Sequence, residues 1–178
     1  MRCIMMKESM IQVICGPGKG KSTSAMGRGI SALAKGSNVI MVQFLKGSLD
    51  MDNMEILKRL EPEFKIFRFE KTPVFFDQLA EEEKNEARIC IRNGLNFAKK
   101  VLVTGECDIL ILDEILGILD EGVITRDELC ALISQARQAG IRLILTGNVY
   151  PDYLDACVDE VTKLQTRYER HFLLTSIS

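Results

Sequence analysis

A glycine-rich loop between an expected strand and an expected helix is the feature that most limits how this chain can fold. Residues 13–23 read VICGPGKGKST, with an apolar run before the glycines and a helical pattern after them. In a P-loop, backbone N–H groups turn inward around an anion, and glycines allow positive φ angles and close approach to phosphates. Cys15 occupies the position of the usual first glycine. The context of strand, loop and helix predicts a phosphate-binding site.

Each part of this loop has a predicted role. Lys21 is placed to reach phosphate oxygens, and the hydroxyl of Ser22 is placed to meet Mg²⁺. The helix that starts near Lys21 adds the positive end of its dipole. A plain strand-to-helix turn is the alternative reading. The loop residues predicted to bind the nucleotide are Gly16, Pro17, Gly18, Lys19, Gly20, Lys21, Ser22 and Thr23.

Apolar runs of strand length alternate with helical stretches along the chain, which predicts an α/β fold with a mostly parallel sheet flanked by helices. Two runs, Ile109–Leu112 and Leu143–Leu145, are continuously apolar, as in strands covered on both faces. We expect strands at Met10–Cys15, Asn38–Leu45, Phe64–Phe69, Asp108–Leu112, Ile141–Thr146 and Glu160–Leu164. We expect helices at Gly20–Lys35, Met54–Leu60, Gln78–Thr104 and Arg126–Gln138.

Length, charge and cysteine content narrow the class of protein. The length of 178 residues fits one domain, so we expect an N-terminal extension at 1–9 and a single P-loop nucleotide-binding domain at 10–178. Lys and Arg total 23 against 25 for Asp and Glu, which argues against nucleic acid as a partner. The six cysteines contain no Cys-x-x-Cys pair, so neither a zinc site nor a disulfide framework is expected. The start lacks the pattern of a secretory signal and no run is long enough to span a membrane, so we expect a cytoplasmic protein.

A second site element is an apolar strand that ends in two carboxylates. Asp113 and Glu114 follow Ile109–Leu112 directly. In open α/β sheets, an acid at the carboxyl end of a neighbouring strand holds Mg²⁺ or its water shell. The predicted metal-side residues are therefore Ser22, Asp113 and Glu114, unless the two acids only begin a helix. The segment 146–148, Thr-Gly-Asn, either touches the nucleotide or forms a turn with a left-handed glycine.

Four segments resemble the P-loop type of ATP:corrinoid adenosyltransferase in order and spacing. They are the phosphate loop, VQFLKG at 42–47, LILDE at 110–114 and LTG at 145–147, and the similarity spans about Ile11 to Lys163. The resemblance implies a RecA-like P-loop NTPase fold and a reaction in which a cobalt(I) corrinoid attacks the 5′ carbon of ATP and displaces triphosphate. It also implies ATP as co-substrate, Mg²⁺ or Mn²⁺, the corrinoid as substrate, a homodimer, and an electron donor such as a flavoprotein.

The resemblance assigns further residues. Because cobalt is the nucleophile, the protein must stabilise charge on the leaving triphosphate rather than activate a side chain. The catalytic residues implied are Lys21, Lys46 and Glu114, and Gln43 joins the nucleotide-binding set. Phe75 and Phe76 are placed to crowd the lower face of the corrinoid, and ordinary core packing is the alternative for both.

Several positions depart from the family pattern. Ser31 stands where an arginine is common, and Ala34-Lys35-Gly36 where Gly-His-Gly is common, while the tail stops short of the usual glycine-containing end. Arg28, one helical turn before Ser31, lies on the same helix face and is a possible substitute for that arginine. Two other functions remain open. One is a P-loop nucleoside kinase, and the other is a non-catalytic module that binds ATP or corrinoid.

Overall fold

A single six-stranded sheet organises the chain. The computed structural model describes residues 9–44, 57–69 and 79–167. All the strand pairings are parallel, in the order β3-β2-β4-β5-β1-β6. The strands are β1 (Ile11–Cys15), β2 (Val39–Gln43), β3 (Phe64–Arg68), β4 (Ile109–Asp113), β5 (Arg142–Gly147) and β6 (Glu160–Lys163). The six predicted strands and the α/β fold class are confirmed.

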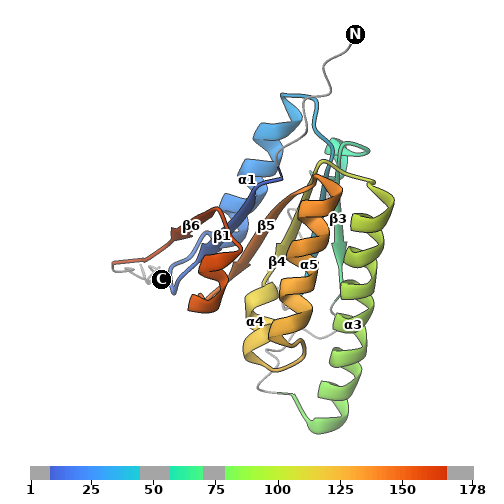
Figure 1. Cartoon of the computed structure of the whole chain (residues 1–178). Coiled ribbons are helices and arrows are strands. Elements are labelled where there is room, and N and C mark those ends of the chain that lie inside the picture. Colours follow the sequence, from blue (N-terminus) through green and yellow to red (C-terminus); the bar gives the residue numbers. More distant parts are fainter. Residues whose placement is uncertain (1–8, 45–56, 70–78, 168–178) are drawn as a thin grey trace, which may run out of the picture.

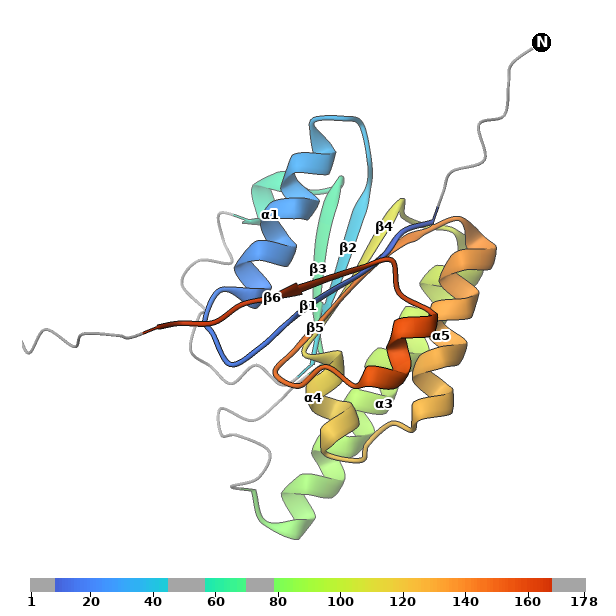
Figure 2. The same cartoon turned by 60° about the vertical axis from the view of Figure 1, so that its left-hand side comes forward.

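Helices cover both faces of the sheet unequally (Figures 1 and 2). One face carries α1 (Lys21–Leu33), and the other carries α3 (Glu81–Thr104), α4 (Ile115–Asp120) and α5 (Arg126–Ala139). Alternate residues of β4 enter two separate cores, with Ile109 and Ile111 beneath α1 and Leu110 and Leu112 beneath the other three helices. Burial on both faces explains why this strand is continuously apolar.

The helix boundaries agree with the sequence where the signals are strong. The capping box of Thr125 and Glu128 begins α5, and Gly140 in the left-handed conformation ends it. The predicted helix Gln78–Thr104 is α3, which begins at Glu81 with acidic residues in its first turn. The described part of the predicted helix Met54–Leu60 is mainly a 3₁₀ turn, η1 (Lys58–Leu60).

Two short elements were not predicted. They are α4, with six residues, and the 3₁₀ turn η3 (Asp152–Ala156), with five. A helix of this length spans fewer than two turns, so it shows no period that separates it from a loop. Within the described residues, no helix is both long and apolar enough to cross a bilayer.

The order of the strands corrects one expectation. The strand that ends in Asp113 is not next to β1, because β5 lies between them. The register pairs Leu112 with Leu145 and Cys15 with Gly147, so the carboxyl ends of the three strands still meet at one edge. This edge therefore brings the phosphate loop, β5 and the carboxylates of β4 together.

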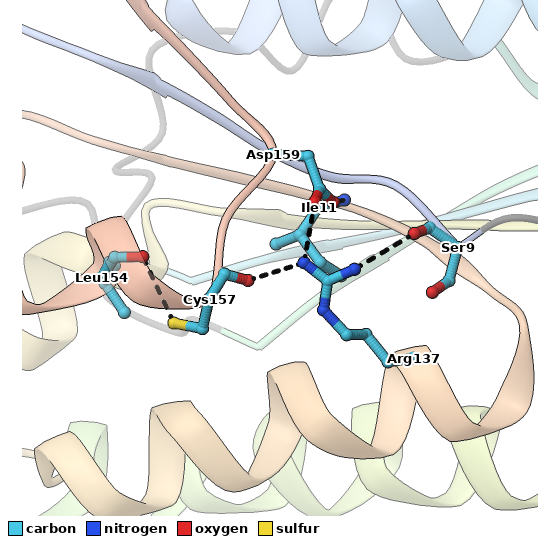
Figure 3. A network of polar contacts seen from close by, with 6 residues as sticks. All are labelled: Ser9, Ile11, Arg137, Leu154, Cys157 and Asp159. Carbon is cyan, nitrogen blue, oxygen red and sulfur yellow. Dashed lines mark hydrogen bonds and ion pairs between the residues drawn. The ribbon is translucent and has the colours of Figure 1, made fainter.

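A polar network anchors β6 beside β1 (Figure 3). The guanidinium of Arg137, in the last turn of α5, donates to Asp159 Oδ1 at 2.9 Å and to Cys157 O at 3.0 Å. The other carboxylate oxygen of Asp159 accepts the Ile11 N–H at 2.7 Å. The bond from Arg137, helped by that from Ile11, holds the pKa of Asp159 below its ordinary value. The turn before β6 is thus tied to both α5 and β1.

We expect Asp159→Asn to lower the free energy of unfolding by about 0.5–1 kcal/mol at neutral pH, because a partly exposed ion pair is lost. The folded pKa of Asp159 is lowered, so its contribution is present above the ordinary value of 3.8 and is lost as pH falls through the folded pKa. Urea unfolding at pH 7 and about pH 3 should show the difference from wild type shrink in acid. Glu86→Gln, at an exposed position of α3, is the control, and an equal loss there would contradict this account.

Candidate functional site

The phosphate loop joins β1 to α1 and closes around one lysine side chain. Gly16 and Gly20 have positive φ angles of 109° and 96°. Lys21 is only 8% exposed, and its Nζ donates to Gly16 O and Gly18 O, each at 2.9 Å. The first turn of α1 contains no acidic residue, so no carboxylate of that turn neutralises the positive end of its dipole. The loop thus gathers positive charge at the start of α1.

Three loop amides do not turn inward as predicted. The N–H groups of Gly16, Gly18 and Lys19 donate to protein oxygens, at 2.9, 3.1 and 3.2 Å respectively. The acceptors are, in the same order, Asn148 O, Leu164 O and Thr166 Oγ1. The loop's free donors are therefore expected at the start of α1, because the first-turn amides of a helix have no acceptor within the helix.

The segment that follows β6 explains this difference. A Cβ at Gly16 would lie 2.3 Å from Leu164 O, and one at Gly18 would lie 2.8 Å from Gln165 N. Leu164 N also donates to Cys15 O at 2.7 Å. Both glycines are thus required by close packing against the backbone that leaves β6, in addition to any role with phosphate.

A buried hydrogen-bond network lies at the same edge of the sheet. Asp113 is fully buried, and its Oδ2 accepts from Gln43 Nε2 at 3.0 Å while its Oδ1 accepts from Thr146 Oγ1 at 2.7 Å. The Thr146 hydroxyl accepts from Glu114 N at 2.8 Å, and Arg68 Nε donates to Gln43 Oε1 at 2.9 Å. The network joins the carboxyl ends of four neighbouring strands, β3, β2, β4 and β5.

Glu114, the residue immediately before α4, has an unusual backbone conformation. Its φ is 63°, which is the left-handed region, and no other described non-glycine residue has a positive φ. Such a conformation persists only where the surroundings fix it, and it is found often at functional sites. Here the hydrogen bond from its amide to Thr146 fixes it, next to the buried Asp113.

The segment 146–148 has a structural role that neither alternative described. Thr146 belongs to the Asp113 network, and Asn148 O accepts from the loop amide of Gly16. Gly147 is not left-handed, and a Cβ there would lie 2.4 Å from Leu116 Cβ in α4. This segment therefore links the phosphate loop to the carboxylates of β4 across the intervening strand.

The positions that depart from the family pattern lie elsewhere. A cavity of about 680 Å³ between α1 and β6 is lined by Ser31, Lys35 and Arg28, but by neither Lys21 nor Asp113. Arg28 bonds to Glu160 Oε1 at 2.6 Å and Thr162 Oγ1 at 3.0 Å. It therefore ties α1 to β6 and does not point to the Asp113 network.

Other predicted site residues lie outside the described part of the chain. These are Lys46, Phe75 and Phe76, so their roles remain predictions. Sequence reasoning missed Arg68, which ends a strand, and Thr166, which follows one. The signal that could have found them is their position at or just after the end of a predicted strand, because polar residues at the carboxyl ends of parallel strands meet at one edge of the sheet.

The family model for the ATP:corrinoid adenosyltransferases BtuR/CobO/CobP matches residues 7–173. The chain belongs to this family. It is 28% identical over 160 residues to corrinoid adenosyltransferase CobA of Salmonella typhimurium, which covers 89% of this chain and 78% of that protein. It is 25% identical over 159 residues to the corrinoid adenosyltransferase of Escherichia coli K12, with the same coverage. The family resemblance inferred from the four motifs is thus confirmed.

A solved structure supports the fold. A KaiC-like protein from Pyrococcus horikoshii OT3 superposes with a TM-score of 0.58 and 16% identity, covering 91% of this chain and 75% of that one. This similarity confirms the RecA-like P-loop fold that the family resemblance implies for this chain.

We expect Thr146→Val to lower the free energy of unfolding by about 1–3 kcal/mol, because Asp113 loses a donor and the Glu114 amide loses its acceptor with little change in volume. Chemical denaturation measures this change. Thr104→Val, at the exposed end of α3, is the control and should stay within about 0.5 kcal/mol of wild type. Equal effects of the two substitutions would show that the Thr146 hydroxyl has no special role.

Proposed function

We propose that this chain transfers the 5′-deoxyadenosyl group of ATP to a cobalt(I) corrinoid and releases triphosphate. The cobalt electron pair forms a bond to C5′, and the C5′–O bond breaks with its electrons leaving on triphosphate. Cobalt is thereby oxidised from the +1 to the +3 state, so no external oxidant is required. The observation that carries the proposal is the buried Lys21 at the start of α1, in a chain that belongs to the family.

The protein contributes electrostatic stabilisation rather than a nucleophile. Lys21 and the first turn of α1 would meet the triphosphate, on which negative charge grows as the bond to C5′ breaks. Burial raises the pKa of the nearby Cys15 thiol, although Lys163 and Lys21 oppose the shift, so this thiol stays protonated at neutral pH. A protonated thiol is a poor nucleophile, and the proposed reaction does not need one.

The residues at this edge fit a Mg²⁺ ion that arrives with ATP. Within residues 9–44, 57–69 and 79–167, no three His, Cys, Asp or Glu side chains gather in a metal cage. Mg²⁺ commonly needs only one or two carboxylates, with phosphates and water completing its shell. Ser22, Asp113 and Glu114 offer such oxygen donors, and both oxygens of Asp113 already accept hydrogen bonds, which favours contact through water. When bound, Mg²⁺ would neutralise charge on the phosphates.

The remaining assignments rest on the family resemblance. We propose Lys46 as a further catalytic lysine and Phe75 and Phe76 as corrinoid contacts. Gln43 takes part through its bond to Asp113. We also propose a homodimer, a cytoplasmic location and a reduced flavoprotein as the electron donor. Cobalt(I) requires a reducing environment, which suits the cytoplasm.

A turnover assay separates this proposal from its two rivals. The protein is mixed with MgATP and chemically reduced cobalamin, and the cobalt(I) absorbance and the phosphate products are followed together. We expect the cobalt(I) band to disappear as triphosphate appears in equal amount. Release of ADP would instead indicate a kinase, and binding without turnover would indicate a non-catalytic module.

We expect Lys21→Ala to lower ATP affinity by at least about tenfold, because a charge-assisted contact worth about 1.5–3 kcal/mol is lost. Isothermal titration calorimetry measures the affinity, and a thermal melt checks that the variant is folded. Lys35→Ala removes an exposed lysine just beyond the other end of α1 and should leave ATP binding unchanged. Unchanged affinity in Lys21→Ala would contradict the proposed site.

A further inference from the structure

Arg68 is the outermost member of the Asp113 network, on the side of the network away from β5. It is the last residue of β3, and the sheet register places it next to Gln43, which in turn is next to Asp113. Hydrogen bonds of 2.9 and 3.0 Å connect the three side chains in this order. A row of polar side chains therefore crosses three adjacent strands at the carboxyl edge.

The chemistry of the three groups fixes the direction of the row. A glutamine amide has a donor end and an acceptor end of almost the same shape, so its partners decide which way it faces. Arg68 can only donate, which requires the oxygen of Gln43 to face β3. The NH₂ group must then face Asp113. In the flipped orientation, the amide oxygen would face the carboxylate, leaving two acceptors in contact.

Burial makes this orientation important. Gln43 is 2% exposed and Asp113 is fully buried, so water does not readily replace a missing donor. Hydrogen bonds in such a chain also strengthen one another. Thr146 donates to the other oxygen of Asp113, and the Gln43 amide holds Oδ2 from the side of β2.

We propose that Arg68 is a positioning residue for Asp113 and acts on it through the Gln43 amide. The inference rests on the proposed function only in placing Mg²⁺, or its water shell, at Asp113. Loss of Arg68 frees the Gln43 amide to turn, and Asp113 then loses a fixed donor. Residues that orient metal-side ligands in this way typically change metal affinity by about 10–100-fold.

The test measures ATP binding by calorimetry at increasing Mg²⁺ concentration. We expect Arg68→Met to raise the Mg²⁺ concentration for half-maximal ATP binding by about tenfold. Gln43→Leu should do the same, and the double variant should be no worse than Gln43→Leu alone, because Arg68 acts through Gln43. Arg68→Lys keeps a donor and a charge and should recover part of the loss.

Two controls separate positioning from a general loss of structure. Arg142→Met removes an exposed arginine at the amino end of β5, on the opposite edge of the sheet, and should leave the Mg²⁺ requirement unchanged. In the ligand-free protein, the side-chain ¹⁵N–¹H signals of Gln43 should shift in Arg68→Met and not in Arg142→Met. This second readout needs neither metal nor turnover.

Three results would overturn the proposal. They are an unchanged Mg²⁺ requirement in Arg68→Met, additive losses in the double variant, and unchanged Gln43 amide signals. Failure of the proposed function would be seen separately, as absence of adenosyl transfer by the wild-type protein. In that case, the Mg²⁺ dependence of ATP binding and the Gln43 NMR signals would still test whether Arg68 acts on Asp113 through Gln43.

Discussion

The candidate site at the carboxyl edge of the sheet depends on the buried carboxylate of Asp113, which must be supplied with hydrogen-bond donors. A buried charge is costly unless hydrogen-bond donors surround it, and here donors come from both adjacent strands. Gln43 supplies one from β2 and Thr146 supplies the other from β5. Thr146 also accepts the amide of Glu114, which holds that residue in its left-handed conformation. Satisfying one carboxylate thus fixes the ends of three strands and the start of α4.

The phosphate loop is subject to a second constraint from the distant end of the chain. Lys19 N bonds to Thr166, 147 residues away, and Gly18 N bonds to Leu164 O. The Arg137 and Asp159 network keeps β6 in place beside β1, so the segment after it reaches the loop. Glycine is needed at positions 16 and 18 for this contact, because a Cβ at either position would clash with the backbone that follows β6. The start of α1 is consequently the part of the loop best able to receive phosphate.

Local features were predictable from the sequence, and features set by distant contacts were not. The central strands β4 and β5 were found because both of their faces are buried, which makes their apolar runs continuous. The Gly-Lys-Ser sequence and the Asp-Glu pair marked the loop and the carboxylates because each comes shortly after an apolar run of strand length. The insertion of β5 between β1 and β4, the contact of Leu164 with the loop, and the row from Arg68 to Asp113 depend on the packing of the whole sheet. No short sequence motif specifies these contacts.

A crystal structure with ATP and Mg²⁺ tests the central claim most directly, namely that the triphosphate binds at the start of α1. The account predicts phosphate oxygens within hydrogen-bond distance of Lys21 Nζ and of the first-turn amides of α1, with the metal or its water shell facing Asp113. A triphosphate bound elsewhere, or one at the loop with Lys21 turned away from it, would contradict the account.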